Sequence, residues 1–147
     1  MRVMHRILRT LLIFVLLAAA GFAADNFAET KKNAEAGDAW AQYYLGMMYA
    51  EGEGVPKDEA EAVKLFRLAA ERGNAMAQGS LGMMYYNGYG VPIDFVQAHV
   101  WFNIAAANGN EAAKPGLESV QNEMTSEQKA EAMKLARELF AKLPKGK

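Results

Sequence analysis

The feature that most constrains this chain is a gapless internal repeat with a period of 36 residues. The Gly-Asp-Ala triplet that starts at Gly37 returns as Gly-Asn-Ala at Gly73, and 73 − 37 = 36. When residues 37–72 are placed on residues 73–108 without a gap, 18 of the 36 positions are identical. A repeat of this length is typical of a solenoid, in which one supersecondary unit packs on copies of itself.

Each repeat has the pattern of two helices joined by a glycine-rich and proline-containing loop. Asp38 is placed to cap a first helix, and residues 39–50 include no proline or β-branched residue. The loop sequence Gly-Glu-Gly-Val-Pro at 52–56 ends that helix, because glycine permits positive φ and proline restricts the residue before it. Asp58 is placed to cap a second helix, and Glu61 can complete a capping box. The pattern predicts an all-α fold, an α/α superhelix (solenoid) of helix-loop-helix repeats.

A glycine also lies in the middle of the first helix of both repeats, at Gly46 and Gly82. Glycine inside a helix costs about 1 kcal/mol relative to alanine. Because this cost recurs at the same repeat position, we expect a neighbouring helix to pass too close there for a β-carbon.

The first 23 residues carry the pattern of a secretory signal peptide. Basic side chains open the chain, and an uncharged apolar run of 14 residues follows at 11–24. A retained membrane anchor is the alternative, but the run is shorter than the roughly 20 residues that a spanning helix needs. We expect cleavage after Ala23, with Ala20 as the other candidate. The protein is therefore predicted to be periplasmic or secreted, without a stable membrane anchor.

The charge of the remaining chain argues against a nucleic-acid partner. Removal of Arg2, Arg6 and Arg9 leaves 13 of the 16 Lys and Arg against 17 Asp and Glu, a net charge of −4. No stripe of basic residues is present to neutralise phosphates. The sequence also contains no cysteine, which excludes a lipid anchor on cysteine and leaves packing as the source of stability.

Three strings of residues carry a family resemblance. They are AQYYLGMMY at 41–49, GEGVPKD at 52–58 and AVKLFRLAAERG at 62–73. Together they resemble the Sel-1-like repeat (SLR) family, which is related to the tetratricopeptide repeat. The resemblance implies an α/α superhelix that serves as an adaptor or scaffold for other proteins, with no chemistry and no cofactor of its own.

The third repeat departs from the family pattern. Pro115 falls in the middle of what would be its first helix, so that helix should start late or kink. A capping box at 125–128 predicts a last helix to about Lys142, which would cap the stack. The expected organisation is a signal peptide at 1–23, an N-terminal capping segment at 24–36, repeats at 37–72 and 73–108, a partial repeat with a C-terminal capping helix at 109–143, and a tail at 144–147.

The first helix of each repeat has more apolar faces than packing against one partner helix needs. One stripe, assigned to packing against the second helix, consists of Ala41, Leu45, Met48 and Tyr49. A second stripe at the same spacing is expected to line a concave groove that binds an unknown protein or peptide, because the resemblance places the first helix on the concave face. Its predicted partner-binding residues are Trp40, Tyr43, Met47, Met76, Met83 and Tyr86.

Two explanations of this second stripe remain open. Aromatic and methionine side chains suit an adaptable peptide-binding groove. For the methionines, packing between repeats is the favoured explanation, since Met47 and Met83 are the same residue at the same repeat position.

No catalytic, cofactor or metal site is predicted. His99 is the only histidine after the first 23 residues and has no second histidine to form a metal pair. The Gly-x-Gly of each loop follows no strand and precedes no Lys-Ser or Lys-Thr, so it reads as a turn. We therefore expect an interaction scaffold that is not an enzyme. The alternatives are a groove-based binder or hydrolase of cell-wall fragments or β-lactam-like ligands, and a homo-oligomerising structural module.

Overall fold

The computed structural model describes residues 26–144, and the predicted signal peptide at 1–23 and residues 145–147 lie outside this range. The described residues form seven helices and no strand. A first helix at 26–35 is followed by α2 (Ala39–Glu51), α3 (Glu59–Glu71), α4 (Ala75–Asn87), α5 (Phe95–Ala107), α6 (Ala113–Glu123) and α7 (Ser126–Lys142).

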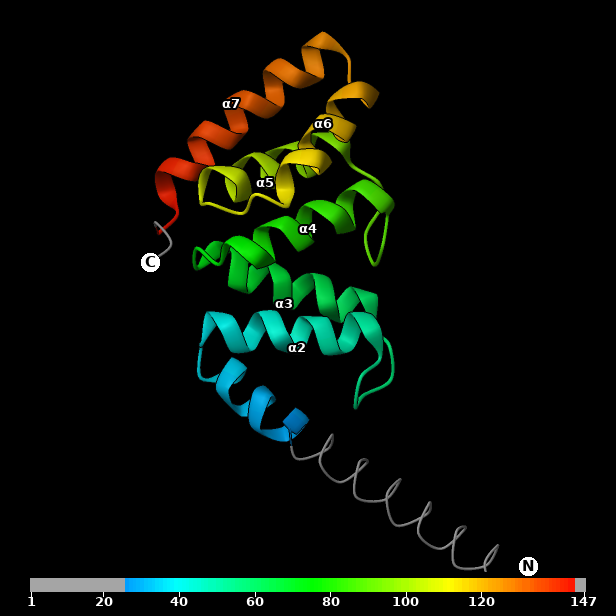
Figure 1. The fold of residues 1–147 in the computed structure, drawn as a ribbon, viewed down its shortest axis with the longest axis vertical. Helices are drawn as coiled ribbons and strands as arrows, with labels where there is room; N and C mark the ends of the chain where they lie inside the picture. The colour runs from blue at the N-terminus through cyan, green and yellow to red at the C-terminus, as the bar shows by residue number, and fades with distance from the viewer. Residues whose placement is uncertain (1–25, 145–147) are drawn as a thin grey trace, which may run out of the picture.

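The helices stack in chain order along the long axis of the molecule (Figure 1). Each helix from α2 to α5 packs on the next one in the chain, and α7 packs back on α5. The period in the sequence is also the period of the structure, because α4 starts 75 − 39 = 36 residues after α2 and α5 starts 95 − 59 = 36 residues after α3. The predicted all-α solenoid is confirmed.

The first helices of the two repeats begin and end in the same way. The Asp38 side chain accepts a hydrogen bond from the amide of Ala41 at 2.7 Å, and Asn74 accepts one from the amide of Ala77 at 2.9 Å. Both helices end at a glycine in the left-handed region, Gly52 with φ 74° and Gly88 with φ 75°. A side chain at such an angle is disfavoured, which explains why both loops start with glycine.

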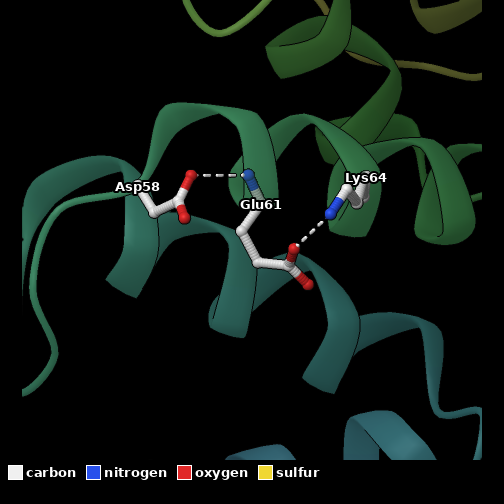
Figure 2. A network of polar contacts seen from close by, with 3 residues as sticks. All are labelled: Asp58, Glu61 and Lys64. Carbon is white, nitrogen blue, oxygen red and sulfur yellow. Dashed lines mark hydrogen bonds and ion pairs between the residues drawn. The ribbon is translucent and has the colours of Figure 1, made fainter.

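One predicted cap forms only in part. Asp58 accepts a hydrogen bond from the Glu61 amide at 3.0 Å, but the Glu61 side chain does not return to the Asp58 amide. It pairs instead with the Lys64 ammonium at 2.7 Å, one turn along the helix (Figure 2). The capping box predicted for Glu61 is therefore wrong, because the Asp58 amide already donates to the Tyr49 carbonyl at 2.9 Å. At the start of α7 the predicted box does form, between Thr125 and Gln128.

The third repeat begins late, as Pro115 predicted. Helix α6 starts at Ala113, so Pro115 lies in its first turn, where a missing amide breaks no helical hydrogen bond. The side chain of Asn110 donates to the Ala75 carbonyl at 3.0 Å and ties the start of this repeat to α4.

The helices of each repeat are held together by a phenylalanine against a glycine. A β-carbon at Gly46 would lie 2.8 Å from the Phe66 ring, and one at Gly82 would lie 2.7 Å from the Phe102 ring. Both rings are buried in the main core. The predicted close approach at the two glycines is confirmed, and the neighbour is a ring of the second helix.

Candidate partner-binding site

The apolar surface of α2 is divided between two buried clusters. Leu45 forms a small buried cluster with Ala34 of the 26–35 helix and Leu65 of α3. The rest of the first predicted stripe, Ala41, Met48 and Tyr49, packs against this cluster. Much of that stripe therefore faces the N-terminal helix, and its assignment to α3 alone is wrong.

The second predicted stripe also packs against the core. Tyr43, Met47 and Ala50 pack against the main core, and the Tyr43 ring lies 5.9 Å from the Phe66 ring between centroids. The reason lies in the architecture, because a helix inside a stack is flanked by the preceding and following units as well as by its own partner.

The six predicted partner-binding residues fall into two groups. Tyr43, Met47 and Tyr86 are half-buried against the main core. The other three are exposed, Trp40 by 54%, Met76 by 42% and Met83 by 47%. The structure thus leaves half of the predicted set exposed, while the other half packs against the core.

Burial is also visible in the electrostatics of Tyr43. Burial raises the pKa of its hydroxyl, the neighbouring Tyr44 raises it further, and the nearby Ser80 side chain partly offsets the two. The contact with Ser80 links α2 to α4, so Tyr43 joins the two repeats.

Trp40 belongs to an aromatic cluster that includes a residue absent from the predicted set. Its ring lies 6.0 Å from Tyr43 and 6.1 Å from Tyr44, and the two tyrosine rings are 5.4 Å apart. Tyr44 is 56% exposed. Comparison of the repeats could have found it, because the equivalent position, 44 + 36 = 80, holds Ser80. A large aromatic side chain found in only one repeat is not needed for the common packing.

Two surface pockets adjoin this exposed region. The first, of about 460 Å³, lies between the 26–35 helix and α2 and is lined by Asn26, Asn33, Tyr44 and Glu53 among others. The second, of about 400 Å³, lies between α2 and α4 and includes Glu51, Ser80, Met83 and Tyr89. Met47 lines both pockets, so one side chain separates them. Tyr89 is a further exposed residue outside the predicted set.

The charges around the pockets are predominantly negative. Lys57 is bonded to Glu59 at 2.8 Å, and this pair raises the pKa of the Lys57 ammonium. Glu51 and Glu53 form no ion pair with any residue between 26 and 144. Both stand at the C-terminal end of α2, where the helix dipole adds to the negative potential.

His99 has a structural environment. It is fully buried in α5, and its Nε2 lies 3.2 Å from the side-chain nitrogen of Gln121 on α6. Burial lowers the pKa of the imidazole, and Lys129 lowers it further. Across residues 26–144 no three His, Asp or Glu side chains gather as a metal site would require. Over the same residues no helix has the length and apolar character needed to cross a membrane.

The stacked repeats of this chain match a known family of proteins. A sequence profile of the Sel1 repeat matches residues 41–74 and 75–110. This chain is a Sel1 repeat protein. The two matched segments contain α2 with α3 and α4 with α5, which are the two helical pairs of the stack. The resemblance drawn from the sequence is confirmed.

Solved structures of Sel1 repeat proteins share the fold. A protective antigen of uropathogenic Escherichia coli with an SLR fold is 34% identical over 82% of this chain, with a TM-score of 0.79. A Sel1 repeat protein from Oxalobacter formigenes is 41% identical over 66% of this chain, with a TM-score of 0.65. The chain spans only 26% and 28% of the lengths of these two proteins. A comparison with curated proteins found no match.

Proposed function

We propose that this Sel1 repeat protein is an exported scaffold of the bacterial envelope that binds a protein or peptide partner through the exposed side of α2 and α4. Sel1 repeats are a scaffold type of repeat, and a stack of helices offers an extended surface rather than a catalytic pocket. The half-buried side chains of Tyr43, Met47 and Tyr86 are proposed to support that surface from beneath.

The observation that carries the proposal is the exposure of large apolar side chains on this side. Trp40, Tyr44 and Met83 each leave about half of their surface in solvent. Single exposed apolar residues are ordinary, but Trp40 and Tyr44 are adjacent, and Met83 lines the neighbouring pocket. Tryptophan and tyrosine are also the residue types that most often dominate binding energy at protein interfaces.

Export is proposed from the sequence of residues 1–23 alone. We expect N-terminal sequencing of the protein recovered from the envelope to begin at Ala24. A full-length chain that remains in the membrane fraction would contradict a free protein in the periplasm or medium.

Site-specific photo-crosslinking in the cell tests the binding proposal. A photoreactive phenylalanine analogue replaces Trp40 or Met83 in the exposed region, and Glu131 on α7 as a control. We expect one discrete heavier adduct from the first two positions and none from Glu131. No adduct, together with a thermal shift on adding peptidoglycan fragments or a β-lactam, would favour the small-molecule alternative.

A further inference from the structure

The two pockets beside the aromatic cluster share one wall. The first holds Tyr44 and Glu53, the second holds Met83 and Glu51, and Met47 lines both. Apolar side chains and carboxylates are therefore found together in each pocket. A ligand that reaches across Met47 would meet an apolar surface and a negative charge on both sides of it.

The carboxylates of this groove are only partly balanced by the protein itself, since Lys57 pairs with Glu59 and also attracts Glu51. Among the charged groups that line the two pockets, only Lys57 is basic, and Glu59 already holds it at 2.8 Å. Glu51 and Glu53 are exposed and form no ion pair with a described residue. The pockets therefore carry an excess of two negative charges at the C-terminal end of α2.

We infer that the occupant of this groove is a peptide segment of a partner protein in which an apolar side chain stands next to a lysine or arginine. The inference rests on the proposed function and specifies the chemistry of its partner. The apolar side chain fills the space between Met47 and Met83, and the cationic side chain lies against Glu51 in the same pocket, while Glu53 adds negative charge on the other side of Met47. Tyr89 lines the same pocket, where an aromatic ring adds to the attraction for a cation. An acidic partner segment is disfavoured, since it would bring like charges together.

A random library of 12-residue peptides displayed on phage and selected on the full-length protein tests this inference. We expect the enriched peptides to place Lys or Arg within two residues of an aromatic or aliphatic residue. A synthetic copy of an enriched peptide is then titrated by fluorescence anisotropy against the wild type and two double variants. Glu51→Gln with Glu53→Gln should weaken binding roughly threefold to tenfold, as expected for two exposed ion pairs.

The matched control is Glu131→Gln with Glu138→Gln, which removes two exposed carboxylates from α7. It should leave the affinity within twofold of the wild type, and the wild-type affinity should fall as salt is raised from 50 to 300 mM.

No enrichment, enrichment of acidic or uncharged peptides, or equal binding by both double variants would overturn the inference. A mass in solution that doubles with concentration, without peptide binding, would assign the groove to a second copy of the chain instead. If only the predicted preference for a cationic peptide fails, the crosslinked adduct at Trp40 or Met83 should still form. The proposed function is therefore tested separately from this inference.

Discussion

Single residues set how closely the two helices of each repeat approach. Gly46 and Gly82 lower the helix propensity of α2 and α4, and each leaves room for a phenylalanine ring that is 1% exposed. The sequence predicted the close approach because the same costly residue recurs after 36 positions. It did not identify the ring, because Phe66 and Phe102 are also explained by the apolar face of their own helices.

Gly46→Leu and Gly82→Leu should each destabilise the protein by roughly 1 to 3 kcal/mol, although leucine is the better helix former. The reason is that the first side-chain atom would already lie under 3 Å from a buried ring. Urea unfolding measures the change, and Ala130→Leu at an exposed position of α7 is the control for a larger side chain. An unfolding free energy that stays constant or rises in either glycine variant would show that no such contact exists.

His99 should make the protein less stable in mild acid. Its pKa is lowered by burial, so the unfolded chain takes up the proton near pH 6.5 while the folded protein still excludes it. Stability is therefore lost as the pH falls below about 6.5, by at most about 1.4 kcal/mol per pH unit for one proton. His99→Val uses the residue found at the equivalent position of repeat 1, Val63. We expect the unfolding free energy of the wild type to drop relative to this variant between pH 7.5 and 5, and a constant difference would contradict the role of His99.

At the scale of helices and loops, the sequence predicted the boundaries better than the contacts. Asp38 and Asn74 begin α2 and α4 and Gly52 and Gly88 end them, because caps and left-handed glycines act locally. Stripes such as the one through Leu45 show which sides of a helix are apolar but not which neighbour covers them. The stack decides that, since an inner helix such as α4 packs on α3, α5 and α6. Tyr44 lies outside both predicted stripes, because the stripes rest on helical spacing alone and not on differences between the repeats.

The loop after α4 packs on the first turn of α3, and Gly90 is the residue that this contact requires. A β-carbon there would lie 2.3 Å from the Glu59 carbonyl oxygen, and the φ of Gly90 is 67°. Gly109 has a similar angle, φ 90°, with no atom within 4 Å of its β-carbon position. Gly109→Ala should therefore cost about 1 to 2 kcal/mol from backbone strain alone, and Gly90→Ala should cost more. Equal losses of unfolding free energy in the two variants would contradict the packing of this loop on α3.

At the scale of the whole molecule, the stack gives α2 and α4 two tasks. Their half-buried side chains join one repeat to the next, as Tyr43 does, and their exposed side chains remain free, as Trp40 does. The sequence predicted apolar residues on this side, but not which of them are half-buried and which are exposed. Apolar residue types occur in both settings. The proposed binding surface therefore requires that its exposed side chains can be removed without loss of the fold.

Paired measurement of stability and binding in alanine variants tests this claim most directly. Trp40→Ala, Tyr44→Ala and Met83→Ala should each change the unfolding free energy by less than about 0.5 kcal/mol, because these side chains are exposed. Each should weaken binding of the crosslinked partner, by up to about thirtyfold for an aromatic anchor worth about 2 kcal/mol. Tyr43→Ala, half-buried against the core, should lose about 2 kcal/mol or more of stability. If Trp40→Ala unfolds as readily as Tyr43→Ala and the partner still binds, the exposed side of α2 and α4 belongs to the fold and the proposed binding surface is contradicted.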